Sequence, residues 1–90
     1  MFIALIARDK PGALQTRLDN RDAHLAYIEE TGIVAQAGPL LDKDGEMAGS
    51  LIVLDVPDVV SANAWAAGDP YAKAGLFHSV ELLPWKKVIG

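Results

Sequence analysis

The chain has 90 residues, and we expect one domain over residues 1–90. Its 12 acidic and 8 basic residues give a net charge of −4, which argues against nucleic acid as a partner. Because the chain has no cysteine, disulfides and thiolate chemistry are excluded and the cytoplasm is the expected location.

The first predicted element is a strand from Phe2 to Ala7. This run is apolar throughout, and a Pro-Gly turn follows it. It is too short for a membrane span and lacks the basic start of a signal peptide. We therefore expect no membrane partner.

A long helix is predicted from Ala13 to Thr31, with Gly32 as its C-terminal stop. Four aliphatic residues at helical spacing form one apolar stripe along it: Leu14, Leu18, Leu25 and Ile28. Because such a stripe normally packs against a core, we expect these side chains on the inner face of the helix.

The rest of the chain, from residue 33 on, predicts five further elements. They are strands over 33–40 and 47–56, a helix from Pro57–Asp58 to Gly68, a helical turn from Asp69–Pro70 through Ala74, and a strand over 77–83, with 84–87 as a tail. An Asp-Gly sequence between the two strands suits a hairpin.

The resulting βαββαβ order predicts an α+β, ferredoxin-like fold, an antiparallel four-stranded sheet with the helices on one face. A sheet with one wet face should alternate apolar and polar residues, yet 2–7 and 51–54 are apolar at every position. The hydrophobic share of 51% is also high for so short a chain. We therefore expect a homodimer in which a second subunit covers the other sheet face.

Three polar residues of the long helix, Arg17, Arg21 and His24, share a face that borders the apolar stripe. One interpretation is that the arginines bury only their stems or pair with nearby acids, and that His24 is a boundary residue. The functional interpretation requires a carboxylate from elsewhere in the chain. Asp69 is the best candidate, and one of its oxygens can cap a helix while the other faces the histidine.

Ser50 and Tyr71 are weaker candidates for contact with a ligand. Ser50 follows Gly49 in a predicted strand, where a small residue serves either close packing or a ligand. Tyr71, like Trp65, is more typical of a core or rim position. Most of the other aspartates near turns and strand ends are expected to be solvated: Asp9, Asp42, Asp44, Asp55 and Asp58.

No metal or nucleotide motif is found in the sequence. The two histidines, His24 and His78, form no HxH or HxxxH pair, and spacing identifies no partner for His78. The glycines form neither GxGxxG nor GxxxxGK[ST]. We therefore expect no metal and no cofactor.

Several motifs in order resemble the YCII-related family: 17–25, 37–40, 49–53, 64–66, 69–71 and 84–88. The resemblance implies a ferredoxin-like domain of the dimeric α/β-barrel kind. It also implies that His24 and Asp69 match a catalytic dyad proposed for the family, with Arg21, Gly49 and Ser50 near the same pocket. A few relatives are lyases that act on hydroxylated, chlorinated aromatic rings.

These observations predict a small acid–base enzyme of lyase or isomerase type that acts on an anionic or phenolic small molecule. His24 would move a proton while Asp69 fixes its tautomer. Arg21, with Arg17, would hold an anionic or enolate oxygen, and Ser50 and Tyr71 complete the predicted binding residues. The alternative is a dimer that binds or senses a small metabolite without turnover.

Overall fold

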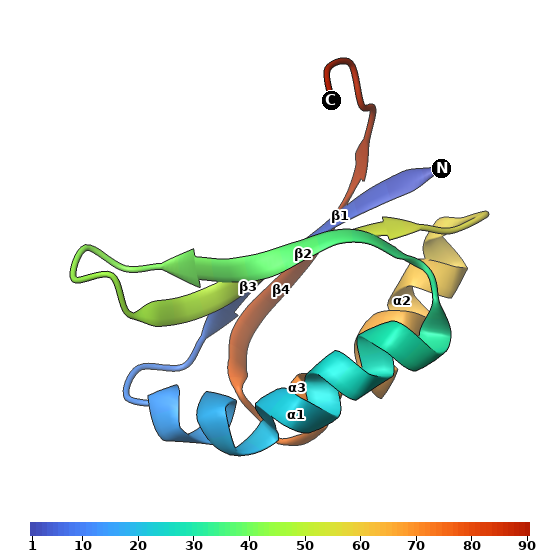
Figure 1. Ribbon diagram of the computed structural model, residues 1–90. Helices are drawn as coiled ribbons and strands as arrows, with labels where there is room; N and C mark the ends of the chain where they lie inside the picture. Colours follow the sequence, from blue (N-terminus) through green and yellow to red (C-terminus); the bar gives the residue numbers. More distant parts are fainter.

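A four-stranded antiparallel sheet and a layer of helices make up the computed structural model, which describes residues 1–90 (Figure 1). The elements are β1 (Phe2–Asp9), α1 (Leu14–Thr31), β2 (Val34–Leu41), β3 (Met47–Asp55), α2 (Val59–Gly68), α3 (Pro70–Lys73) and β4 (Phe77–Trp85). The strand order β2-β3-β1-β4 confirms the predicted ferredoxin-like fold. None of the helices combines the length and apolar content needed to cross a membrane.

The core lies between the sheet and the helices. Ile3 and Leu5 of β1 are fully buried there, and they pair with Leu54 and Ile52 of β3. Trp65 of α2 packs against the same cluster. Each fully buried Ile or Leu contributes about 1.5–3 kcal/mol to stability, so this cluster holds the sheet against the helices that position the site.

The prediction that the apolar stripe of α1 packs on the core was wrong for Leu18 and Leu25, whereas Ile28 does pack against the core. Leu18 and Leu25 are 47% and 46% exposed, whereas Arg17 and His24 are the buried residues of the helix. The reason is that each of these two polar side chains binds a carboxylate, Arg17 that of Asp9 and His24 that of Asp69. A buried Arg or His that is hydrogen-bonded to a carboxylate avoids the cost of desolvation, so these pairs set the rotation of the helix.

The last strand is longer than predicted. β4 includes Pro84 and Trp85, which the sequence assigned to a tail, and Trp85 lies opposite Phe2 of β1 with ring centroids 5.9 Å apart. Pro84 is tolerated because β4 is an edge strand. Only residues 86–90 extend away from the sheet (Figure 1).

The sheet face turned away from the helices is apolar and uncovered. Leu51, Leu83 and Trp85 on this face are 41%, 45% and 43% exposed. Together with Ala4 and Ile6 they line a hollow of about 400 Å³. This is the face for which the sequence predicts a second subunit.

Candidate active site

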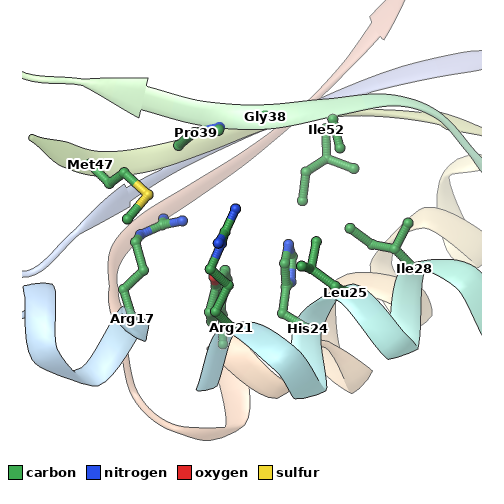
Figure 2. A pocket seen from close by; sticks show the side chains of 11 residues that line it. Arg17, Arg21, His24, Leu25, Ile28, Gly38, Pro39, Met47 and Ile52 are labelled. Atoms are coloured by element: carbon green, nitrogen blue, oxygen red, sulfur yellow. The ribbon is translucent and has the colours of Figure 1, made fainter. Parts of the chain in front are cut away.

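A pocket of about 150 Å³ lies between α1 and the strands β2 and β3 (Figure 2). Its polar side is made by Arg17, Arg21 and His24 of α1 and by Tyr71 of α3. Its apolar side is made by Leu25, Ile28, Ala37, Pro39, Met47 and Ile52. Because a cavity of about this volume accommodates a single six-membered ring, the pocket suits a small cyclic compound.

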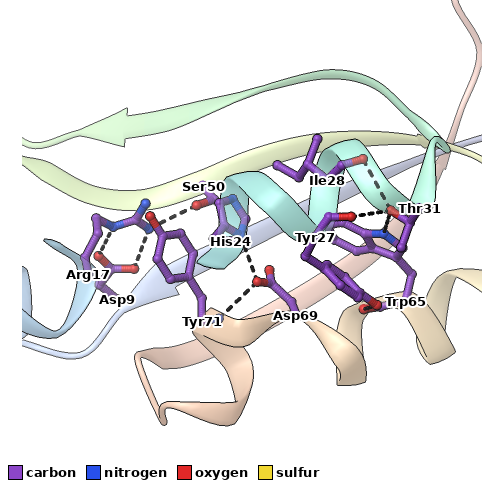
Figure 3. Close-up of polar contacts among 10 residues, drawn as sticks. All are labelled: Asp9, Arg17, His24, Tyr27, Ile28, Thr31, Ser50, Trp65, Asp69 and Tyr71. Carbon is purple, nitrogen blue, oxygen red and sulfur yellow. Dashed lines mark hydrogen bonds and ion pairs between the residues drawn. The ribbon is translucent and has the colours of Figure 1, made fainter. Parts of the chain in front are cut away.

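His24 and Asp69 meet beside this pocket although they are 45 residues apart in the sequence. Nδ1 of His24 lies 2.7 Å from Oδ1 of Asp69, and the two side chains are only 7% and 1% exposed (Figure 3). A carboxylate at Nδ1 favours the tautomer that carries its proton there. Nε2 is then an unprotonated nitrogen, available to accept a proton from a ligand.

Asp69 also caps α3, but it does so differently from the prediction. Its Oδ1 accepts both the His24 contact and the backbone N–H of Tyr71, the latter at 3.0 Å. The two oxygens therefore do not divide these tasks. Oδ2 is buried without a protein partner.

Tyr71 is packed between two residues of α1. Its ring stacks on His24 with centroids 3.9 Å apart and planes inclined by 15°, and Cζ of Arg17 lies 4.7 Å from the ring centroid. Arg17 and His24 are about two helical turns, or about 10 Å, apart along α1, which leaves room for the ring between them (Figure 3). Burial raises the pKa of Tyr71, although the charges of Arg17 and Arg21 oppose this rise.

Arg17 is held in place by the side chains of Asp9 and Ser50. Nε and Nη2 bind the two carboxylate oxygens of Asp9 at 2.7 and 2.8 Å, and Nη2 also donates to Oγ of Ser50 at 3.0 Å. Burial alone would lower the pKa of Arg17, but the contacts with Asp9 and Tyr71 together outweigh it and the pKa is raised. Arg17 is therefore a fixed cation in the wall of the pocket.

The expectation that Asp9 is solvated was wrong, since its side chain is 5% exposed in the ion pair with Arg17. β1 continues to Asp9 and so carries this carboxylate under the start of α1. A buried strand that ends in an acid, eight residues before an arginine, is the sequence signal that could have pointed to this pair. Asp9 is thus the one site residue that the sequence reasoning missed.

The other predicted residues occupy distinct positions. Arg21 points into the pocket, is exposed and takes part in none of the ion pairs of the protein (Figure 2). Ser50 is buried beneath Arg17 and does not line the pocket. Gly49 has no room for a side chain, because a Cβ would collide with the carbonyl oxygen of Ala7. His78 lies on β4, outside the pocket.

Comparison with known proteins gives a consistent family and fold. Residues 1–86 match the model of the YCII-related domain. Protein YciI of Escherichia coli is 34% identical, with 98% of this chain and 99% of that protein aligned. An uncharacterized protein of Haemophilus influenzae is 31% identical over the same shares of the two chains.

Two solved structures are also similar. The 5-chloro-2-hydroxyhydroquinone dehydrochlorinase of Burkholderia phenoliruptrix, in complex with 2,5-dihydroxybenzoquinone, is 34% identical with a TM-score of 0.87, covering 96% of this chain and 94% of that one. An antibiotic biosynthesis monooxygenase is 11% identical with a TM-score of 0.57, covering 96% and 98%, and shows a common fold alone.

Proposed function

Because the chain belongs to the YCII-related family, we propose that it is a small acid–base enzyme of lyase or isomerase type in which His24 transfers the proton. One observation carries the proposal. A histidine hydrogen-bonded at 2.7 Å to a buried aspartate lines a pocket that also contains two arginines. This arrangement has the parts that proton transfer requires and lies where a small molecule fits.

In the proposed reaction, Nε2 of His24 accepts a proton from the substrate. Asp69 positions the imidazole and stabilises the imidazolium that forms, without touching the substrate itself. General acid–base catalysis by a positioned histidine contributes about 10²–10⁴-fold to a rate. Elimination and isomerisation next to a carbonyl or phenol both begin with such a transfer.

The two arginines favour an anionic or phenolic substrate. Arg21 is free of ion pairs and points into the pocket, so it can meet a negatively charged group as it enters. Arg17 keeps its charge beside the apolar wall because Asp9 and Ser50 hold it there. The pocket volume of about 150 Å³ suits a substrate of about one ring with small substituents.

The dehydrochlorinase that is 34% identical supports this substrate class. Its name describes loss of hydrogen chloride from a hydroxylated ring, a reaction in which a proton must be removed and a chloride ion leaves. That reaction needs a base and a means of holding phenolic oxygens, and His24, Arg17 and Arg21 would supply them here.

Chloride release from 5-chloro-2-hydroxyhydroquinone, together with binding of 2,5-dihydroxybenzoquinone, tests the proposal. We expect saturable binding of the quinone and chloride release above the rate in buffer. Chlorinated phenols with the hydroxyls in other positions extend the search if this substrate reacts slowly. Binding of these compounds with no reaction of any of them would contradict the enzyme and favour a binding or sensor protein.

We also propose that two chains associate through the uncovered sheet face. The support is the apolar hollow of about 400 Å³ on that face, lined by residues such as Leu51, Leu83 and Trp85. Sedimentation at micromolar protein should give twice the monomer mass, and Leu51→Asp should give the monomer, because a charge would be desolvated in the interface. A wild-type monomer at that concentration would contradict the dimer.

A further inference from the structure

We propose that the Tyr71 hydroxyl and Nη1 of Arg17 form a two-donor site for the substrate oxygen that gains negative charge, which makes Tyr71 a second catalytic residue beside His24. This inference rests on the proposed function and names the groups that would complete it. It also narrows the substrate class to compounds whose acidic hydrogen lies next to a carbonyl oxygen.

The donors of Arg17 are the first part of the argument. A guanidinium has five N–H groups. The Nε–H and the two Nη2 hydrogens are used by Asp9 and Ser50, which leaves the two hydrogens of Nη1 for the adjacent Tyr71 hydroxyl oxygen and for a ligand. Because three bonds fix the plane of the group, Nη1 is held in position before any ligand arrives.

The proton of the Tyr71 hydroxyl is the second part. The residue is 2% exposed and lines the pocket, and its hydroxyl lies beside the Arg17 guanidinium. A guanidinium has no hydrogen-bond acceptor, so the Tyr71 hydroxyl cannot donate a hydrogen bond to Arg17. Because Tyr71 lines the pocket, a ligand there can accept this proton.

The stacking of Tyr71 on His24 gives the third part. The two rings are nearly parallel, with centroids 3.9 Å apart, so the base on one ring and the donor on the other serve neighbouring atoms of one molecule. An enolisable carbonyl compound has this arrangement, since its acidic C–H is one bond away from the carbonyl carbon. Hydroxylated rings belong to this class in their keto tautomers, in which a tetrahedral C–H lies beside the carbonyl carbon.

The chemical step balances without any further reactant. Nε2 of His24 takes the proton from carbon, the electrons of the C–H bond form a carbon–carbon double bond, and the carbonyl π electrons move to oxygen. Tyr71 and Arg17 donate hydrogen bonds to that oxygen. The carbonyl then re-forms, either as His24 returns the proton to another carbon or as a leaving group departs from the adjacent carbon with its bonding electrons.

The protonation states fit these roles at neutral pH. Burial raises the pKa of Tyr71, so its hydroxyl keeps the proton that it must donate. The charges of Arg17 and Arg21 oppose the rise and Asp69 adds to it, and all three groups are near the ring. A hydroxyl beside two cations is a stronger donor to an oxyanion than an isolated phenol.

Tyr71→Phe is the test, because it removes the hydroxyl and keeps the ring that stacks on His24. Removal of one oxyanion donor typically lowers kcat by about 10²–10³-fold, and we expect a loss in this range for chloride release with little change in KM. The melting temperature should stay within a few degrees of the wild type. Tyr27→Phe is the matched control, since the Tyr27 hydroxyl binds the carbonyl of Trp65 outside the pocket, and its kcat should not change.

Three outcomes decide between the proposals. A Tyr71→Phe enzyme as fast as the wild type would overturn the donor role, while loss of turnover in His24→Gln would leave the acid–base function standing. Equal losses in Tyr71→Phe and Tyr27→Phe would assign Tyr71 a structural role. A wild-type protein that neither binds nor converts the probe compounds would overturn both proposals.

Discussion

Two clusters of aromatic and polar side chains join α1 to the other helices. They differ in whether all of their polar groups have hydrogen-bond partners. The closed cluster consists of Tyr27, Thr31 and Trp65. The Tyr27 hydroxyl donates to the Trp65 carbonyl, the Trp65 indole donates to the Thr31 hydroxyl, and that hydroxyl donates to the Tyr27 carbonyl, each at 2.8 Å (Figure 3). Every polar side-chain group in this cluster has a partner within it.

The open cluster consists of Arg17, His24, Asp69 and Tyr71. Its members are more deeply buried than Tyr27 and Thr31, but several polar atoms face the pocket or remain without a partner: Nη1 of Arg17, Nε2 of His24, the Tyr71 hydroxyl and Oδ2 of Asp69. A protein that only needed stability at this end of α1 would satisfy these groups internally. The difference supports the proposal that the closed cluster holds the fold and the open cluster binds a ligand.

The largest effect that separates the two roles is expected from Asp69→Asn. Asparagine caps a helix as well as aspartate does, so the melting temperature should hardly change. An amide cannot stabilise an imidazolium, and it can present a donor where His24 needs an acceptor, so turnover should fall by about 10²–10⁴-fold. Nitrogen-15 NMR of the His24 ring should show a shift in tautomer.

Asp58→Asn is the control for this variant. Asp58 caps α2 in the same way, by accepting a hydrogen bond from the backbone N–H of Ser61 at 2.8 Å. It is exposed, and neither Asp58 nor Ser61 lines the pocket. This hydrogen bond from Ser61 lowers the pKa of Asp58. Its substitution should leave turnover unchanged, and an equal loss in both variants would reduce Asp69 to a helix cap.

The fold was predictable from the sequence because each element carries its own signals. The strands are apolar runs bounded by turns, and Gly32, Asp58 and Asp69–Pro70 mark helix ends at the positions found, with Gly32 in the left-handed conformation at φ 65°. Such features are local, so a single sequence displays them.

The rotation of α1 and the contents of the site were less predictable. Periodicity assigned Leu18 and Leu25 to the core, because it counts apolar residues and cannot register that a buried acid will pair with an arginine. The role of Asp9 depends on where β1 ends, and the position of Tyr71 depends on α1, α3 and the sheet meeting. Asp69 was a candidate partner for His24 from the residues alone, and the family resemblance made the pair the favoured interpretation, since nothing local joins residues 45 positions apart.

A smaller effect, on stability alone, is expected from Tyr27→Phe in the closed cluster. The variant loses the hydrogen bond to the Trp65 carbonyl and leaves that carbonyl without its partner, which should cost about 0.5–1.5 kcal/mol of unfolding free energy. Urea denaturation measures this change, and the chloride-release rate should equal that of the wild type. A slower reaction with unchanged stability would contradict the assignment of Tyr27 to stability alone.

The smallest effect concerns alkaline pH. Burial raises the pKa of both Tyr71 and Tyr27, so the folded protein keeps their protons at pH values where the unfolded chain, with tyrosine pKa near 10, begins to lose them. Unfolding then releases protons, and stability falls as pH rises above about 10. Urea denaturation between pH 8 and 11 should show a shallower fall in Tyr71→Phe, and identical slopes would contradict the raised pKa of Tyr71.

The most direct measurement of the central claim follows proton transfer itself. Hydroxyhydroquinone, the chlorine-free form of the probe substrate, is incubated with the protein in D₂O, and proton NMR records exchange of its ring hydrogens. We predict that the wild type accelerates this exchange over buffer, and that His24→Gln removes the acceleration while still binding 2,5-dihydroxybenzoquinone. Exchange at the wild-type rate in His24→Gln would contradict the role of His24 as the proton-transfer group.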